Sequence, residues 1–506
     1  MKPILTAQQM RDMERAYFDT GVASIDLMER AAAALCDELW RALAGRGKTC
    51  VFACGTGGNG GDGYAAARRF AEKGGRAILL PVGQPRTADG IQNCERARGK
   101  VFAFADVAGL DALPRPDAWV DCLFGIGLSR APVGDAARVI ERMNADRAAG
   151  SLTVSADIPS GLSADDGTVF SPCVHADVTV AFQTAKPGHW LGGGMDVCGR
   201  LAVRDIGIPA SLLPKDALQL VDGSDAAQAL PARRRTAHKN DFGHLLIVAG
   251  SRGMAGAAAM CTRAALRSGV GLTTVACPEN CLPILQTLAP EAMCLPLPET
   301  NGALSADAAP LLMDALRGKT AIAAGCGLSM RASDACIRVL LESGLPVVLD
   351  ADALNLIAAD GSHDSDGASL RNLLHAGCAL TPHPGEAARL NGEMLPATEA
   401  AARLHALGPA VLLKGACSLI VGDGHFLSAS GSVGMAKGGS GDALTGIVGA
   451  LLAQGLSPTT ALWLGSELHG RAGMLAEEEK GVFSMLPTDL IEALPRAFRF
   501  LEDLRR

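Results

Sequence analysis

The sequence predicts an α/β protein of two domains, each built on a mainly parallel sheet that is covered by helices on both faces. Short apolar segments alternate with longer helical patterns in both halves of the chain. Such alternation is typical of parallel sheets, because each crossover between parallel strands places a helix on a sheet face. The length of 506 residues fits two to four domains. With 48% hydrophobic and 20% charged residues, the chain has enough apolar side chains for large cores.

The first half opens with a helical stretch at Thr6–Trp40, where apolar residues recur at helical spacing. The glycine-rich segment Gly55–Gly63 then indicates a tight turn between a strand and a helix. The strands expected in this half are Cys50–Cys54, Ala77–Val82, Ala118–Cys122, Leu152–Ala156 and Val178–Phe182, and the helices that follow the glycine-rich turn are Tyr64–Lys73 and Ala136–Arg147.

A break follows Ile208-Pro209, and the region up to Arg235 has no strong periodicity. We therefore expect a first domain over residues 1–212, a linker over 213–235 and a second domain over 236–506. Gly422-Asp423-Gly424 indicates a hairpin between two short strands. The second domain is expected to contain strands His244–Ala249, Leu272–Cys277, Ala321–Ala324, Val347–Leu349, Ala410–Leu413, Ser418–Val421 and His425–Ser428, and helices Gly256–Ser268, Ala443–Leu452 and Ala461–Ala476.

Charge and composition argue against several classes of function. The net charge of −7 argues against a general nucleic-acid binder, and the basic run Arg233–Arg235 is expected to be a solvated part of the linker. The 15 cysteines lack zinc-site spacing, which favours free buried thiols in a reducing compartment. We expect no membrane partner and a cytoplasmic location, because no apolar run has the length of a membrane span and the start lacks a signal-peptide pattern.

The glycine-rich segment of the first half has the composition of an anion cradle. Glycines let backbone N–H groups approach phosphate oxygens, and the start of the following helix favours negative charge. The spacing differs from the usual dinucleotide-binding fingerprint, although ligands of open α/β sheets bind beyond the carboxyl ends of the strands. A purely structural turn is the alternative, which Asn59 and Asp62 in the same segment disfavour.

Two carboxylates of the first half stand at strand ends. Asp121 ends one strand and Asp157 follows another, three residues before Ser160. Together with Asn59 they predict an all-oxygen site for a hard cation rather than for zinc. The alternative is that Asp121 caps a turn and Asp157 pairs locally.

The second half contains a similar cradle. Gly434–Asp442 leads directly into an apolar helix, and the N–H groups at such a helix start attract anions. Because the charge of Asp442 would repel phosphate, this residue is better suited to act as the base for a hydroxyl that attacks a phosphoryl group. A simple N-cap is the alternative.

Three further segments carry polar residues at turns. Lys414–Ser418 follows a strand and is suited to contact the phosphate or ribose of a nucleotide, with an exposed turn as the alternative. Asp350–Asn355 ends a strand with two acids and an amide, and Thr381–Glu386 indicates a rigid turn that holds His383. A lone histidine is more often structural than functional.

Four motifs of the first half resemble the NAD(P)H-hydrate epimerase family: Gly55–Gly63, Asp121–Ala131, Asp157–Gly161 and Lys186–His189. The resemblance covers roughly residues 1–210 and implies a Rossmann-like three-layer domain, often dimeric, that binds potassium. Gly58 stands where the family usually has a second asparagine. The implied potassium ligands are Asn59, Asp121 and Ser160. The implied contacts to the hydrated coenzyme are Gly58, Asn59, Gly60, Gly61, Asp62, Gly125, Ile126, Gly127, Leu128, Ser129, Arg130, Ala131 and Asp157.

The second half, from about His238 to the C-terminus, resembles the ADP/ATP-dependent NAD(P)H-hydrate dehydratase family of ribokinase-like fold. The resemblance rests on His238–His244, Gly250–Ala257, Asp350–Asn355, Thr381–Glu386 and Gly438–Asp442. It implies that Mg²⁺ binds with ADP or ATP, and Cys326 replaces the usual proline of one loop. The implied hydrate contacts are Ala257, Gly327, His383 and Asp442, and the implied nucleotide contacts are Lys414, Gly415, Ala416, Cys417, Ser418 and Gly441.

Together the two resemblances imply a bifunctional repair enzyme for hydrated NADH and NADPH, acting as a homo-oligomer on small molecules without nucleic acid. The first domain would interconvert the R and S hydrates, with Asp157 as acid and base. The second would dehydrate the S form at the expense of ADP or ATP, with Asp442 as base, releasing phosphate and AMP or ADP. Two alternatives stay open: a true small-molecule kinase of ribokinase type, and a first domain that binds without catalysing.

Overall fold

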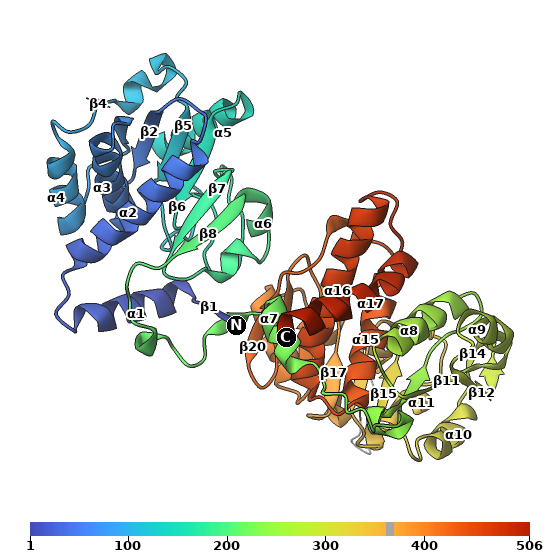
Figure 1. The fold of residues 1–506 in the computed structure, drawn as a ribbon. Coiled ribbons are helices and arrows are strands. Elements are labelled where there is room, and N and C mark those ends of the chain that lie inside the picture. The colour runs from blue at the N-terminus through green and yellow to red at the C-terminus, as the bar shows by residue number, and fades with distance from the viewer. Residues whose placement is uncertain (361–368) are drawn as a thin grey trace. The chain divides into compact units, whose positions relative to one another are not determined.

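The computed structural model describes residues 1–360 and 369–506. They form two compact units (Figure 1): an N-terminal unit of Pro3–Leu218, and a C-terminal unit of Gln219–Arg506 together with Met1–Lys2. Most of the expected linker 213–235 is therefore part of the C-terminal unit. It contains strand β9 (Leu218–Leu220), which pairs with β20, and helix α7 (Gly223–Ala229), which packs against the last two helices. Both elements are too short to give a periodic sequence signal.

The N-terminal unit is built on a seven-stranded sheet whose described strand pairs are all parallel. The strand order is β4-β3-β2-β5-β6-β7-β8, so the direction of winding reverses between β2 and β5. A reversal of this kind opens a crevice at the carboxyl ends of the two strands. The strands are β2 (Thr49–Cys54), β3 (Arg76–Pro81), β4 (Ala103–Phe104), β5 (Ala118–Cys122), β6 (Leu152–Ala156), β7 (Val178–Phe182) and β8 (Arg200–Arg204).

Helices cover both faces of this sheet, which confirms the predicted three-layer α/β architecture (Figure 1). Cys50, Phe52 and Cys54 of β2 face a core shared with α1–α3, whereas the alternate residues Val51 and Ala53 face a second core shared with α5. The helices are α1 (Ala7–Phe18), α2 (Ser24–Ala42), α3 (Gly58–Glu72), α4 (Ala88–Ala97), α5 (Asp135–Ala148) and α6 (Gly194–Val197).

Two expected elements of this unit differ from the structure. The helical stretch Thr6–Trp40 is divided into α1 and α2 by a turn that includes Gly21, whose φ is 95°. The helix expected from Tyr64 begins at Gly58 instead, so most of the predicted glycine turn is helical. Glycine is a poor helix former, but close packing requires it here: a Cβ at Gly60 would lie 2.0 Å from the Gly55 carbonyl oxygen.

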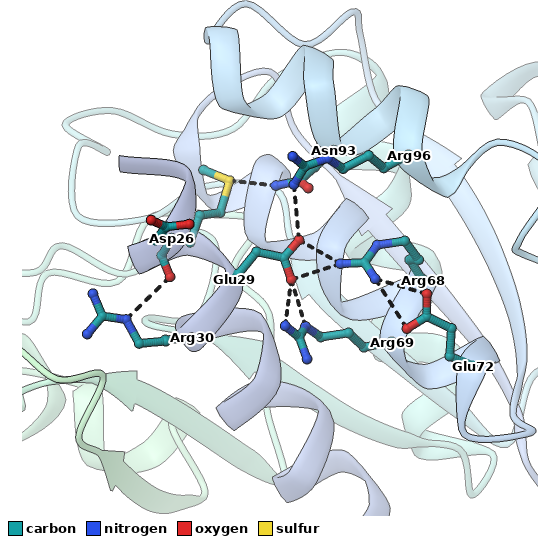
Figure 2. A network of polar contacts seen from close by, with 9 residues as sticks. Asp26, Glu29, Arg30, Arg68, Arg69, Glu72, Asn93 and Arg96 are labelled. Atoms are coloured by element: carbon teal, nitrogen blue, oxygen red, sulfur yellow. Dashed lines mark hydrogen bonds and ion pairs between the residues drawn. The ribbon is translucent and has the colours of Figure 1, made fainter. Parts of the chain in front are cut away.

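An ion-pair network joins three helices of the N-terminal unit (Figure 2). The Glu29 carboxylate of α2 accepts hydrogen bonds from Arg68 and Arg69 of α3 at 2.6–2.8 Å and lies 3.5 Å from Arg96 of α4. Burial alone would raise the pKa of Glu29, but the hydrogen bonds from Arg69 and Arg68 together hold it below its usual value. Glu29 thereby fixes α3, whose first turn is the glycine cradle, against its neighbours.

The C-terminal unit has an eleven-stranded sheet of order β1-β9-β20-β19-β18-β17-β16-β15-β10-β11-β12. The strands from β18 to β12 are parallel, whereas β18, β19 and β20 are antiparallel neighbours. The predicted hairpin is confirmed as β19 (Ser418–Val421) and β20 (His425–Ser428). The remaining strands are β1 (Lys2–Ile4), β10 (His244–Val248), β11 (Leu272–Pro278), β12 (Met293–Leu297), β15 (Ala321–Ala324), β16 (Val347–Leu349), β17 (Cys378–Leu380) and β18 (Ala410–Leu413), with a separate pair β13 (Glu299–Thr300) and β14 (Ala303–Leu304).

Helix α15 (Ser440–Ala453) is the central helix of this unit and is buried along most of its length. It packs on α8 (Ala255–Arg267) so closely that a Cβ at Gly446 would lie 2.1 Å from the Cys261 carbonyl oxygen. This packing fixes the start of α15 relative to the sheet. The other helices are α9 (Leu282–Leu288), α10 (Ala308–Ala315), α11 (Asp334–Glu342), α12 (Asp352–Ala359), α13 (Pro384–Asn391), α14 (Ala397–His405), α16 (Pro458–Lys480) and α17 (Pro487–Arg505).

The structure describes the state of the cysteines and the apolar character of the helices. All 15 cysteines are free thiols; 14 are buried and Cys294 is half-buried. Among the described residues, none of the helices combines the length and the apolar character needed to cross a bilayer.

Candidate functional site

The N-terminal unit contains a cavity of about 810 Å³ at the reversal between β2 and β5. The cavity is lined by most of the residues that the sequence analysis predicted: Gly58, Asn59, Asp62, Gly125, Ile126, Gly127, Leu128, Ser129, Arg130 and Asp157. Three predicted contacts, Gly60, Gly61 and Ala131, are not among the lining residues. Gly60 and Gly61 are buried and allow close packing, since a Cβ at Gly61 would lie 2.6 Å from Met28 Cε.

The first turn of α3 supplies unbonded N–H groups beside this cavity. Gly61 donates to the Gly57 carbonyl at 3.2 Å, whereas the N–H groups of Gly58, Asn59 and Gly60 form no bond within the described part of the chain. Free N–H groups at a helix start, reinforced by the helix dipole, attract anions. The unbonded N–H groups of the predicted cradle therefore lie at a helix start rather than in a turn.

Asp157 lies in the cavity wall directly after β6, with its backbone in the left-handed region at φ 60°. A non-glycine residue in this conformation carries strain, which proteins retain mainly at functional positions. The Asp157 carboxylate forms an ion pair with Lys186 and accepts a hydrogen bond from the Phe182 N–H at 3.1 Å. Lys186 is fully buried, and its ammonium also donates to the carbonyls of Phe182 and Thr184 at 3.2 Å. All three N–H groups of Lys186 are thus used in holding Asp157 and its neighbours.

His189 supports the same arrangement from behind. Its Nδ1 accepts from the Lys186 N–H at 3.0 Å, so its Nε2 carries the proton and donates to the Asp157 carbonyl at 2.9 Å. Burial, and then the nearby Lys186 charge, lower the pKa of His189 to about 4, which keeps the ring neutral. The motif Lys186–His189 therefore positions Asp157.

The predicted oxygen cluster is only partly as expected. The Asn59 side chain donates to the Phe124 carbonyl at 2.8 Å, and Ser160 Oγ lies 3.3 Å from the same carbonyl oxygen. Ser160 Oγ also donates to Asp121 Oδ1 at 2.6 Å. The side chains of Asn59 and Ser160 therefore meet at the Phe124 carbonyl, an oxygen that the sequence did not indicate, and Asp121 joins this group through its hydrogen bond with Ser160. Asp157, which the sequence pattern groups with these residues, is paired with Lys186 instead.

A half-buried carboxyl that the sequence analysis does not identify also lines the cavity. Glu14 of α1 is half-buried and forms no hydrogen bond or ion pair with residues 1–360 or 369–506. Burial, and secondarily the charge of Asp157, raise the pKa of Glu14 to about 7. The sequence feature that points to Glu14 is weak: it is a single acid next to the buried positions Met10, Met13 and Tyr17 of an amphipathic helix.

Asp62 is a second such carboxyl in the cavity wall, and it was predicted. Burial, and then the charges of Asp157 and Glu14, raise its pKa well above the usual range. Asp62 is therefore suited to donate a hydrogen bond while it remains protonated.

In the C-terminal unit, the predicted motifs meet at the start of α15. Lys414, directly after β18, donates to Asp350 Oδ1 at 2.6 Å, and Thr445 of α15 donates to Asp350 Oδ2 at 2.7 Å. Gly441 faces this pair, because a Cβ there would lie 3.4 Å from Lys414 Nζ and 3.5 Å from Asp350 Oδ2. A side chain at this position would therefore contact both Lys414 and Asp350.

Asp442 is the third residue of α15 rather than its N-cap, which is Gly439 in the left-handed region at φ 105°. The N–H groups of Gly441 and Asp442 form no bond in the described segments, so the cradle is available to an anion. Burial raises the pKa of Asp442 to about 6, and the nearby Asp350 charge adds to this rise. A carboxylate with this pKa is mostly ionised at neutral pH and is basic enough to accept a proton from a hydroxyl.

The other predicted residues have defined positions. His383 is the N-cap of α13, where its Nδ1 accepts from the Gly385 N–H at 3.0 Å; the expected rigid turn is thus a helix start. Glu386 of that turn lies 3.8 Å from Lys414, so the turn and the nucleotide segment are brought together. A Cβ at Gly327 would lie 3.0 Å from the Ala257 Cβ, which makes these two predicted hydrate contacts neighbours. Cys417 is buried within the segment Lys414–Ser418.

Comparison with known proteins covers both units. A family model described as YjeF-related protein N-terminus matches residues 24–188, and one described as NAD(P)H-hydrate dehydratase matches residues 245–496. The bifunctional NAD(P)H-hydrate repair enzyme Nnr of Moorella thermoacetica is 36% identical over 99% of this chain and 97% of its own length. The Escherichia coli enzyme of the same description is 33% identical over 97% and 93%. A crystal structure of the ADP/ATP-dependent NAD(P)H-hydrate dehydratase from Bacillus subtilis, co-crystallised with ATP/Mg²⁺, is 29% identical, with a TM-score of 0.48 over 56% of this chain and 99% of that one.

Proposed function

Since the chain belongs to the family of bifunctional NAD(P)H-hydrate repair enzymes, with an epimerase domain and an ADP/ATP-dependent dehydratase domain, we propose that Asp157 and Asp442 are the respective catalytic acids and bases. The observation that carries this proposal is common to both units. In the N-terminal unit, Asp157 lines the same cavity as the start of α3, whose first N–H groups are unbonded. In the C-terminal unit, Asp442 lies in the first turn of α15, where its own N–H and that of Gly441 are unbonded.

In the epimerase site, the hydroxyl of the hydrate must leave one face of the ring and return to the other. Protonation of the hydroxyl by a carboxylic acid lets the ring nitrogen lone pair expel water, with cleavage of the C–O bond. A carboxylate then takes a proton from the water that adds to the opposite face. We assign proton transfer at one face to Asp157, which Lys186 and His189 hold in the cavity wall.

Potassium is proposed for the epimerase domain on the basis of its oxygen cluster. The side-chain oxygens of Asn59, Asp121 and Ser160, together with the Phe124 carbonyl, are ligands that suit a hard, weakly charged ion. Burial raises the pKa of Asp121, although hydrogen bonds from Ser160 oppose the shift, so a cation at this position would stabilise the ionised carboxylate. A bound ion would also hold the Gly125–Ala131 loop beside the cavity.

In the dehydratase site, we propose that Asp442 accepts the proton of the hydrate's hydroxyl. The freed oxygen attacks the terminal phosphoryl group of ADP or ATP, and AMP or ADP leaves. The C–O bond to phosphate then breaks, pushed by the ring nitrogen, and the neighbouring ring carbon loses a proton to restore the dihydronicotinamide. Phosphorylation serves to convert hydroxide, a poor leaving group, into phosphate.

The nucleotide is proposed to lie along Lys414–Ser418 with its phosphates at the Gly441 amide. Lys414 and the unbonded N–H groups of Gly441 and Asp442 supply positive potential there. Mg²⁺ is proposed to enter with the phosphates, as is usual for phosphoryl transfer. The hydrate would contact Ala257, Gly327 and His383, of which the first two are neighbours.

The test uses the full-length chain and a mixture of R and S NADH hydrate, with and without ADP and Mg²⁺. We expect R and S to interconvert without nucleotide, and NADH absorbance and free phosphate to appear in equal amounts only when ADP or ATP is present. A stable phosphorylated hydrate without recovery of NADH would instead indicate a small-molecule kinase. Replacing K⁺ by choline should slow epimerisation alone, and Ser160→Ala should raise the K⁺ concentration required.

Two further expectations remain proposals. The family resemblance supports a homo-oligomer, which light scattering of the purified chain would test. The composition and the many free cysteines support a cytoplasmic location, which fractionation of cells expressing the tagged chain would test.

A further inference from the structure

Glu14 is a cavity-facing carboxyl that has no assigned role in the epimerase site. It lies on α1, one turn after Met10 and Arg11, which line the same cavity. Arg11 contacts the Ile126 carbonyl at 3.4 Å, in the loop predicted to hold the substrate. The cavity-facing side of α1 therefore borders the substrate loop, and Glu14 is the one carboxyl that this side contributes to the lining.

The chain segment before α1 fixes this helix next to the Asp157–Lys186 pair. Ile4 forms a parallel bridge with Ala185, and the Leu5 N–H donates to the Ala185 carbonyl at 3.1 Å. Ala185 directly precedes Lys186, the partner of Asp157. Glu14 and Asp157 thus reach one cavity from two separately anchored elements.

The chemistry of epimerisation requires two proton transfers at different places. The hydroxyl must gain a proton to leave one face of the ring as water. The water that adds to the other face must lose a proton. A single carboxyl fixed by an ion pair and a backbone N–H, as Asp157 is, serves one face. We propose that Glu14 is the second catalytic acid–base residue of the epimerase site, acting on the ring face opposite to that served by Asp157.

The other charged groups that face Glu14 are Asp157, Asp62, Lys186 and Arg11. Lys186 has no free N–H group, and Asp62 is held protonated by its surroundings. Glu14, with a pKa raised to about 7 by burial and by Asp157, both accepts and returns a proton near neutral pH. Its lack of a hydrogen-bond partner among the described residues leaves both oxygens available to substrate or water.

This inference rests on the epimerase activity of the domain, and the experiment tests the role of Glu14 separately from that activity. Full-length wild type and Glu14→Gln are given the pure R epimer of NADH hydrate, without nucleotide, and formation of the S epimer is followed by chromatography. We expect Glu14→Gln to reduce kcat about 10²–10⁴-fold with KM changed less than about threefold, and to remove a limb near pH 7 from the pH profile. Asp12→Asn, on the exposed side of α1, is the matched control and should behave as wild type.

A second variant distinguishes catalysis from folding. In Glu14→Ala, added acetate or formate should restore part of the lost epimerisation rate. Such a rescue requires a folded cavity in which only the carboxylate is missing. A Glu14→Gln chain that keeps the wild-type kcat and pH limb, or that changes KM alone, would overturn the assignment of Glu14. A wild-type chain that recovers NADH from the S epimer with ADP but never interconverts R and S would overturn the epimerase function itself.

Discussion

Lys414 donates a hydrogen bond of 2.6 Å to Asp350, and this carboxylate, which is 2% exposed, also accepts from Thr445. Lys414 therefore has two tasks: it pairs a buried charge, and it contributes positive charge to the proposed phosphate site. Removing the lysine leaves the buried Asp350 carboxylate without its counter-charge. This destabilises the fold more than replacing both partners by uncharged residues would.

We expect Lys414→Met to lower the free energy of unfolding of the C-terminal unit by about 3 kcal/mol and to raise KM for ADP. The double variant Lys414→Met with Asp350→Asn should recover part of the stability, because the Asp350 position then carries no charge, but none of the nucleotide affinity. Urea unfolding and dehydratase kinetics measure the two effects separately. If the double variant recovers the free energy of unfolding and the KM for ADP to the same extent, Lys414 affects ADP binding only by stabilising the fold.

Asp442→Asn is expected to reduce the dehydratase kcat at least about 10²-fold, while interconversion of R and S hydrates continues at the wild-type rate. Wild-type dehydratase activity should fall as the pH drops below about 6, the pKa to which burial raises Asp442, because the base is then protonated. A dehydratase that is as active at pH 5 as at pH 8 would argue against this base.

The same substitution should stabilise the fold above pH 6. Below pH 3.8, the ordinary value, the Asp442 carboxyl is neutral in both the folded and unfolded states. As the pH rises from that value to about 6, Asp442 loses its proton in the unfolded chain but keeps it in the folded chain. The free energy of unfolding therefore decreases over this range. The asparagine of the variant does not ionise, so the variant should gain about 1–2 kcal/mol at pH 8, and its Tm should match wild type near pH 4.

Asp157→Asn is expected to abolish epimerisation and to leave dehydration of the S hydrate unchanged. The substitution preserves shape and the hydrogen bond from the Phe182 N–H but removes the charge that pairs with Lys186. Supplying pure R hydrate with ADP then produces no NADH, whereas pure S hydrate reacts normally. Full conversion of R hydrate by this variant would exclude Asp157 as acid and base.

Glu29→Gln should lower the free energy of unfolding of the N-terminal unit by about 1–3 kcal/mol. The carboxylate pairs with three arginines of α3 and α4 (Figure 2); glutamine removes the counter-charge of Arg69 and Arg96, whereas Arg68 keeps its pair with Glu72. Because the pKa of Glu29 is held low, the loss should be present at pH 7 and diminish as acid protonates Glu29 in the wild type. Asp37→Asn breaks the half-exposed pair with Lys73 and is the control, with an expected cost below about 0.5 kcal/mol.

The sequence predicted the strands better than the helix starts. Buried strands such as β5 and β16 are mostly apolar runs, and Gly422–Gly424 determines the β19–β20 hairpin locally. The start of α3 at Gly58 depends instead on tertiary packing: a Cβ at Gly60 would overlap the Gly55 carbonyl, and one at Gly63 would overlap the side chains of Cys54 and Cys122. β9 and α7 fall within the predicted linker because neither is long enough to show periodicity.

Candidate site residues were predictable where glycines and acids occur together in one short segment. Asp157 and Asp442 stand in such segments, whereas Glu14 is one acid in an ordinary amphipathic helix. The pairing of Asp157 with Lys186, 29 positions later, and the Phe124 carbonyl between Asn59 and Ser160 arise only when the sheet assembles. A backbone oxygen has no sequence signature at all.

The burial of nearly every cysteine has a practical consequence for labelling. Burial raises the pKa of thiols such as Cys173, Cys277 and Cys417 to about 12, so at neutral pH they lack both access and thiolate character. Cys294, on the edge strand β12, is the half-buried exception. A maleimide fluorophore should therefore attach to the native chain at this position alone, giving a single-site reporter for C-terminal unfolding without mutagenesis.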